Sequence, residues 1–252
     1  MRPLSILLTS LRNELIAFLL FLAIWSVTAI FTPVYVIPSP LAVVNSFPGY
    51  LPQNFGHHLA LTGMRVAIGF GISFVISSLL GAMVFTKDGA RSVTAIMSAL
   101  NVLPGMVLGV IFLLLFGIGS AAPITLVAIL TLPTLTINTI NSLMKRNTNQ
   151  EQYLTSIGAQ TSHFAQTLYL PALVPTLLSN LSLGIGLAIK VVIMGEFIGS
   201  QDGLGYLLNV ARNTFNMKEV FFYLAALLVF TLLYQSVLSL LSTTLFRKYY
   251  YA

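Results

Sequence analysis

Long apolar runs alternate with short polar segments along the chain, and six of these runs are long enough to cross a bilayer. A membrane-spanning helix needs about 20 mostly apolar residues. The pattern therefore predicts an all-α membrane protein, a bundle of six transmembrane helices in a single domain over residues 1–252. The predicted spans cover residues 15–31, 59–85, 92–116, 123–144, 168–195 and 220–246. Pro104 and Pro133 fall inside two of them, where neighbouring helices can satisfy the freed backbone groups.

Composition supports residence in a membrane and removes several classes of chemistry. Hydrophobic residues make up 57% of the chain and charged residues 7%, against about 25% charged in globular proteins. The absence of cysteine excludes disulfides and thiolate metal sites. The 12 scattered Lys and Arg form no phosphate-binding stripe, so no nucleic-acid partner is expected. His57 and His58 are adjacent, but no acid or third histidine lies nearby, so we interpret them as an interfacial pair and expect no metal.

The basic residues predict the orientation of the spans. With six spans both termini share a side, and a cytoplasmic N-terminus places eight basic residues inside and two outside, as the positive-inside rule requires. We therefore predict that both termini are cytoplasmic. The first run is interpreted as a retained signal-anchor, because no small-residue cleavage site ends it. The inner eight are Arg2, Arg12, Lys87, Arg91, Lys145, Arg146, Arg247 and Lys248, and the outer two are Arg212 and Lys218.

The inner loop of residues 145–167 is the most polar part of the chain, yet it keeps apolar residues at helical spacing. A helix on either side of Gly158 would gather them on one face. Either the bundle or a soluble partner could cover that face, and the pattern leaves both open. The apolar residues of the loop are Tyr153, Leu154, Ile157 and Phe164.

The two longer outer segments are each expected to hold a short helix. Residues 33–58 carry five prolines and no Asp, Glu, Lys or Arg, which suits a surface helix over Ala42–Phe47. Residues 197–219 include Leu207–Phe215, where apolar and polar residues alternate at helical spacing.

Two charges lie within the predicted spans, Arg65 and Lys190, and Glu196 closes the fifth span; all three fall in the half of the membrane nearer the outside. Each costs about 2.5–3.5 kcal/mol at mid-bilayer, so each needs a reason. Three interpretations stay open: Arg65 reaches the interface while Glu196 meets water, the charges form a buried ion-pair network that braces the second span against the fifth, or they line a path for an anionic substrate.

The fourth span carries Thr134, Asn138 and Asn141 on one face. Side-chain amides within membranes usually hydrogen-bond between helices, with a stabilisation of about 0.6–2 kcal/mol. Packing is therefore the favoured role of these residues, and Asn138 is also a candidate for the translocation pathway.

Four short motifs occur in a fixed order. Gly158 is followed after nine residues by Leu168 and then by Leu170-Pro171. This spacing resembles the cytoplasmic loop of permease subunits of ATP-binding-cassette importers, which reads E-A-A-x-x-x-G, nine residues, I-x-L-P. The front half departs from that pattern, because Gln152 stands in the place of its Glu and Tyr153-Leu154 in the place of its alanines. The other motifs, Ile37-Pro38-Ser39-Pro40, Phe116-Gly117-Ile118-Gly119 and Gly195-Glu196 to Gly203-Leu204-Gly205-Tyr206, are similar to those of the nitrate/sulfonate/taurine-type subfamily.

The resemblance implies the fold of a type I importer permease in a bacterial inner membrane. It implies a homodimer of permeases, two cytoplasmic ATPase subunits and a periplasmic or lipid-anchored solute-binding protein. The permease itself would be no enzyme and hold no cofactor, and the chain has no P-loop motif for ATP. The solute would be small and polar: nitrate, a sulfonate, taurine, or a vitamin precursor such as a pyrimidine or riboflavin.

The same resemblance implies a coupling helix that contacts the ATPase. Its expected residues are Gln152, Tyr153, Leu154, Ile157, Gly158, Ala159, Leu170 and Pro171. Two alternative functions fit the sequence less well. An ion-coupled secondary carrier would normally have more spans with an internal repeat, and neither is evident. A membrane scaffold that transports nothing would leave the spacing of the inner-loop motif unexplained.

Overall fold

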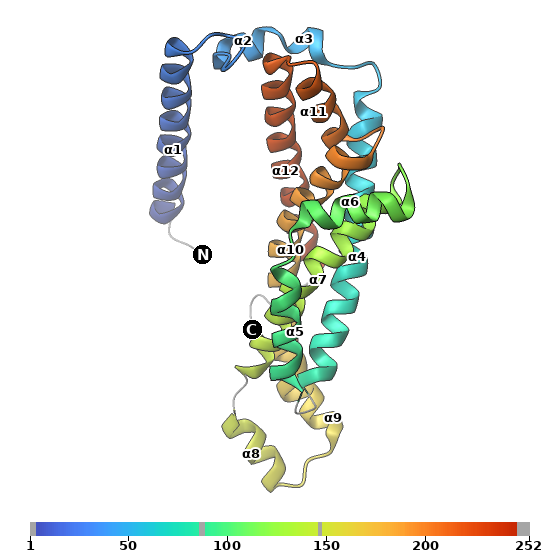
Figure 1. Cartoon of the computed structure of the whole chain (residues 1–252). Helices are drawn as coiled ribbons and strands as arrows, with labels where there is room; N and C mark the ends of the chain where they lie inside the picture. The colour runs from blue at the N-terminus through green and yellow to red at the C-terminus, as the bar shows by residue number, and fades with distance from the viewer. Residues whose placement is uncertain (1–3, 86–88, 146–147, 246–252) are drawn as a thin grey trace. The chain divides into compact units, whose positions relative to one another are not determined.

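The computed structural model describes residues 4–85, 89–145 and 148–245, and within these ranges helices are joined by turns, without a β-strand (Figure 1). The all-α class is thereby confirmed. The helices are α1 (Leu4–Phe31), α2 (Pro40–Asn45), α3 (Phe47–Tyr50), α4 (Phe55–Phe85), α5 (Ala90–Asn101), α6 (Gly105–Phe116), α7 (Ala121–Met144), α8 (Thr148–Ser156), α9 (Thr161–Phe164), the π-helical turn η1 (Ala165–Tyr169), α10 (Leu170–Gly199), α11 (Leu204–Asn213) and α12 (Met217–Leu245).

Four described helices are long and apolar enough to cross a membrane, and one bent pair would make a fifth span. In α1 the apolar stretch Phe18–Phe31 is shorter, so the count of six stays a prediction. The orientation also stays a prediction, because five of the basic residues behind it lie outside the described residues: Arg2, Lys87, Arg146, Arg247 and Lys248. The four long segments are Phe55–Val84, Ala121–Met144, Thr161–Gly199 and Met217–Leu238.

The third predicted span is not one helix. Instead of a continuous helix over residues 92–116, α5 and α6 meet at an angle of 83°. The break lies just before Pro104, which caps α6 with an extended ψ of 116°. Proline lacks the backbone N–H that continues a helix, and it disfavours helical geometry in the residue before it. Pro104 therefore lies at the break between two helices, whereas Pro133 lies inside α7, and residues 92–116 as one span stay a prediction.

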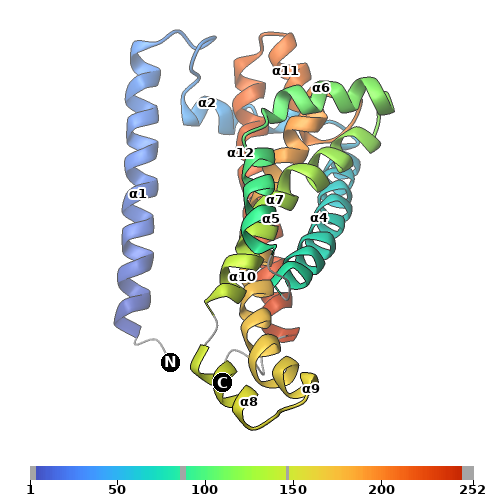
Figure 2. The ribbon, with the colours of Figure 1, turned by 60° about the horizontal axis from the view of Figure 1, so that its bottom comes forward.

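The described helices belong to two compact units, Met1–Phe55 with Leu207–Leu227 and Gly56–Tyr206 with Leu228–Ala252. In the second unit α7 and α10 pack along each other, and α5 and α6 also pack against α7. Figures 1 and 2 both show α8 and α9 beyond the end of α7 that is remote from α6. The short inner-loop helices thus lie at one end of this helix pair.

Small residues allow the close approach of α10 to its neighbours. A Cβ added to Gly195 would lie 2.9 Å from the Cα of Pro123 in α7, and one added to Gly184 would lie 2.5 Å from a ring carbon of Phe70 in α4. Both glycines are buried. In lipid, where apolar side chains gain little by leaving the solvent, such backbone proximity is a principal source of helix association.

In the first unit, Trp25 connects α1 with the segment that follows it in the chain and with the start of α12. The Trp25 ring stacks on Phe221 at 5.3 Å, and its Nε1 donates to the carbonyl of Pro38 at 3.0 Å. Ser39 then caps α2 by accepting from Ala42 N at 3.2 Å, with Pro40 in the first turn. The predicted helix over residues 42–47 therefore starts earlier, at Pro40, and is followed by the separate α3.

Candidate functional sites

The helix α8 of the inner loop ends in a hydrogen-bonded glycine cap. Gly158 has a φ of +68°, a conformation that glycine adopts at little cost. Its N–H donates to the carbonyl of Thr155 at 3.1 Å, and that of Ala159 donates to the carbonyl of Leu154 at 3.0 Å. These two bonds form a Schellman motif, which terminates a helix and fixes the direction of the following chain. The helix–Gly–helix interpretation of the loop is found in the structure.

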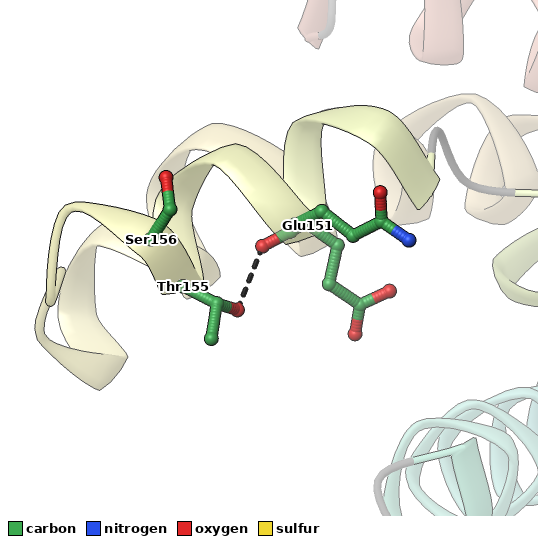
Figure 3. A pocket seen from close by; sticks show the side chains of 4 residues that line it. Glu151, Thr155 and Ser156 are labelled. Atoms are coloured by element: carbon green, nitrogen blue, oxygen red, sulfur yellow. Dashed lines mark hydrogen bonds between the residues drawn. The ribbon is translucent and has the colours of Figure 1, made fainter.

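The apolar side chains of α8 are only partly covered. Tyr153 is 65% exposed and Ile157 58% exposed, whereas Leu154 and Phe164 are half-buried. In the described part of the chain the bundle therefore leaves Tyr153 and Ile157 uncovered. A shallow hollow lies on the polar side of the same helix (Figure 3), where Thr155 Oγ1 donates to the carbonyl of Glu151 at 2.8 Å. Gln152, also in the predicted motif, lines this hollow and is exposed.

The second half of the inner-loop motif starts the long helix α10. Leu168 is buried and anchors the turn η1, while Leu170 is 48% exposed and Pro171 lies in the first turn of α10. From Thr161 to Gly199 the chain runs as one 39-residue apolar segment. The cap at Gly158 and the start of this segment at Thr161 are therefore separated by only two residues.

Arg65 and Glu196 form a fully buried ion pair, with Nη1 2.8 Å from Oε1 and both side chains at 0% exposure. The same guanidinium donates to the carbonyl of Asp202 at 2.9 Å and also pairs with the Asp202 carboxylate. Its Nε and Nη2 donate to Ser120 Oγ at 3.0 and 2.9 Å. One side chain thus connects α4, α10, the turn before α7 and the loop before α11.

The Glu196 carboxylate receives further donors. Thr62 Oγ1 donates to it at 2.9 Å and accepts from Leu204 N at 2.9 Å, while Gly205 N donates to Glu196 Oε2 at 2.9 Å. His58 Nδ1 accepts from Gly203 N at 2.9 Å. His58 is 5% exposed, so its side chain is packed within the bundle, and its position at a membrane interface stays a prediction.

Close packing around this carboxylate explains the glycines of the fourth motif. A Cβ on Gly203, whose φ is +102°, would lie 2.3 Å from the carboxyl carbon of Glu196. A Cβ on Gly205 would lie 2.3 Å from the carbonyl oxygen of Ile193. Only glycine leaves room for both the carboxylate and the amides that bind it. We call Thr62, Arg65, Ser120, Glu196 and Asp202 the ion network.

The ion network answers part of the question about the intramembrane charges. Arg65 does not extend to an interface and Glu196 does not meet water, so the first interpretation is wrong for the described structure. The geometry is that of a brace between α4 and α10. Sequence reasoning missed Thr62, Ser120 and His58. The one available signal was helical spacing, because residues 58, 62 and 65 share a face of α4.

Lys190 and Asn138 lie apart from the ion network. Lys190 is exposed on α10 and makes no ion pair with any described residue. Asn138 Nδ2 donates to Asn180 Oδ1 at 2.6 Å, and Asn180 donates in turn to Thr139 Oγ1 at 2.9 Å. The expected interhelical hydrogen bond of Asn138 is thus present between α7 and α10.

The long apolar helices, with a buried brace between two of them and an exposed short helix at one end, are those of a multi-pass membrane protein. The chain belongs to the family of binding-protein-dependent transport system inner membrane components, which matches residues 73–249. It is therefore a permease of an ATP-binding-cassette importer, located in the bacterial inner membrane, and the resemblance read from its motifs is confirmed.

Individual relatives agree on transport and differ in the solute. The chain is 28% identical over 206 residues to the formylaminopyrimidine transport permease protein ThiX of Halalkalibacterium halodurans, covering 81% of this chain and 82% of ThiX. It is 26% identical over 238 residues to the riboflavin transport system permease protein RibX of Chloroflexus aurantiacus, covering 92% and 88%. An inward-facing structure of the MetNI methionine ABC transporter shares the fold, with a TM-score of 0.66 and 19% identity over 77% of this chain and 97% of the other.

Proposed function

We propose that this chain forms the solute pathway of an ATP-driven importer, with α8 as the coupling helix that contacts a separate cytoplasmic ATPase subunit. The observation that supports this proposal is that Tyr153 and Ile157 are exposed on a helix whose end is fixed by the cap at Gly158. Exposed apolar side chains on a short, held helix are typical of a face that seats in a groove of a partner. A solute-binding protein delivers the solute from the other side, and two permease copies enclose the pathway.

The placement of α8 allows it to transmit movement. It lies in sequence between α7 and α9–η1–α10, and α7 and α10 are packed along each other. When the ATPases close on ATP, they displace α8 together with the cytoplasmic ends of both helices. Coupling of this kind requires a rigid element that switches between two positions and no reacting group in the permease.

The pathway surface is proposed to include Asn138 and Lys190 and to exclude the ion network. Arg65 and Glu196 were candidates for the pathway, but each is fully buried and bonded to the other. They support the helices that carry the pathway. The solute is small and polar, and the relatives' names point to a pyrimidine in one case and to riboflavin in another.

The proposal is tested by charging the exposed face of α8. We expect Tyr153→Glu to abolish both ATPase co-purification and ATP-dependent uptake, with normal amounts of permease in the membrane, because the carboxylate would be desolvated in the ATPase groove. Ser162→Glu, at an exposed position of α9, is the matched control and keeps both. Retention of a fully coupled ATPase by Tyr153→Glu would remove α8 from the interface.

A further inference from the structure

One side of α10 carries exposed polar residues along about 17 Å of the helix, with the exposed Leu183 beside them. Ser179, Ser182 and Lys190 are all exposed, and Gly186 lies between them. At about 100° per residue these four positions fall within about 80° of one another around the helix. The opposite side of α10 holds its buried residues, among them Ile185, Ala188 and Val192.

Neighbouring helices of the second unit add polar groups to this side. Asn138 of α7 has its Nδ2 3.5 Å from Ser179 Oγ. Gln235 of α12 is exposed, and its Nε2 lies 3.1 Å from where a Cβ of Gly186 would be. On α7, Thr134 precedes Asn138 by one turn and donates to Asn101 of α5 at 3.2 Å. We call Thr134, Asn138, Ser179, Ser182, Lys190 and Gln235 the polar strip.

Lipid is a poor environment for the polar strip. Lys190 is nine residues from the end of α10 at Gly199, which is about 14 Å along the helix. A lysine can extend to the membrane interface only when it lies near a helix end. Charged residues deeper in a span face the interior of a bundle or a water-filled cavity. The polar strip is therefore a surface that water or a solute reaches.

A second copy of the chain offers no obvious counter-charge for Lys190. The sequence contains six acidic residues, and two of them lie in the candidate spans, Glu196 and Glu219. Glu196 is already paired with Arg65. Glu219 is in the first turn of α12, where it accepts from Asn216 Nδ2 at 3.2 Å. Within the candidate spans of a second copy, Glu196 and Glu219 thus already have partners, and a passing solute can bring the negative charge for Lys190.

We propose that the polar strip binds solute along the pathway and that Lys190 selects an anionic solute or the anionic group of a larger one. Ser and Asn side chains donate hydrogen bonds to oxyanions, and a lysine adds a compact positive charge with three donors. This inference rests on the proposed transport function. Of the intramembrane charges, it assigns only Lys190 to the lining of a path for an anionic solute, and Arg65 has no part in that lining.

The natural absence of cysteine permits a direct measurement of the charge on the polar strip. Ser182→Cys is introduced into the full-length chain, with its partner subunits, in open membrane sheets. The rates of modification by anionic sulfonatoethyl methanethiosulfonate and cationic trimethylammonioethyl methanethiosulfonate are then compared, without nucleotide and with ATP and vanadate. Residues 182 and 190 are about 12 Å apart along the helix. Coulomb's law with an effective dielectric constant of about 40 then gives about a tenfold preference for the anionic reagent.

Each variant at position 190 has a defined expectation. Lys190→Gln should remove the preference and Lys190→Arg should keep it, with reaction at Ser182→Cys in both. A cysteine at Leu79, on an exposed apolar side of α4, is the control whose reactivity should not depend on residue 190. If Ser182→Cys is unreactive in both nucleotide conditions, the proposal that the polar strip faces the solute is overturned. Equal rates for the two reagents overturn the proposal that the strip selects anions. A preference that survives Lys190→Gln overturns the role of the lysine.

These outcomes are distinct from those of the coupling experiment. The labelling rates without nucleotide report local charge and water access, and their interpretation does not depend on a coupled ATPase. Retention of a fully coupled ATPase by Tyr153→Glu would refute the assignment of α8 as the coupling helix without changing the preference at Ser182→Cys.

Discussion

Removal of both members of the buried ion pair should cost less than the sum of the two single removals. Arg65→Met leaves the Glu196 carboxylate without its cation at a site with 0% exposure. Glu196→Gln leaves the guanidinium with the partly exposed Asp202 as its remaining ion-pair partner. The double variant leaves a neutral amide, which can still accept from Thr62 and Gly205.

The magnitude follows from the geometry of the pair. At 2.8 Å and an effective dielectric constant of about 20, the Coulomb energy of the pair is about 6 kcal/mol. Thr62 and Gly205 continue to donate to the carboxylate and offset part of the loss by about 1–3 kcal/mol in all. We therefore expect Arg65→Met to destabilise the protein by about 3–5 kcal/mol, the range for a broken buried ion pair. The double variant should cost at least about 2 kcal/mol less than the sum of the single variants.

Thermal unfolding of the detergent-purified chain measures these differences. At about 3 °C per kcal/mol for a chain of this size, Arg65→Met should lower the Tm by about 10 °C. Asp202→Asn is the matched control, because its side chain is 37% exposed and its loss should cost far less. Additive effects of Arg65→Met and Glu196→Gln would refute the reasoning, since they would show that the two charges are not coupled.

Three further substitutions test the local geometry. Gly203→Ala places a Cβ against the Glu196 carboxyl in a backbone conformation with positive φ, so it should destabilise the protein by at least about 2 kcal/mol and lower its level in the membrane. The control is Gly56→Ala, whose Cβ meets no atom within 4 Å and whose membrane level should be unchanged. Gly158→Val should abolish uptake at normal membrane level, while Gly158→Asn, which accepts a left-handed conformation, should keep it. Ser39→Ala should lower unfolding stability by about 1 kcal/mol and Ser39→Asp should not.

Features encoded within one stretch of sequence were predictable. The cap at Gly158 and the start of α10 depend on residues close together in the chain, and the spacing from Gly158 to Pro171 indicated both. The break before Pro104 is also encoded locally, but membrane helices can tolerate proline, so the sequence alone did not predict the bend. Hydropathy reports the length of an apolar run and not the direction of its axis, so a sharp bend leaves the pattern unchanged.

The ion network was only partly predictable, because it joins residues far apart in the chain. Arg65 and Glu196 are 131 positions apart, and Arg65 and Ser120 are 55 apart. An intramembrane charge indicates that the side chain needs a partner, but the identity of that partner depends on which helices pack together. The sequence therefore indicated the three charges and the possibility of a brace. The structure shows that Arg65 and Glu196 form this brace and that Lys190 has no part in it.

This separation changes what the intramembrane charges mean for transport. A buried pair with several hydrogen-bond donors is neutral overall and rigid, and a solute could reach it only after the packing of α4 against α10 had opened. An exposed lysine on the opposite side of the buried stripe of α10 is accessible without any such cost. The same helix thus carries its structural charge on the packed side and its free charge on the open side. Since the two sides of one rigid helix move together, the brace to α4 and the hydrogen bond from Asn138 of α7 also fix the position of Lys190 relative to those two helices.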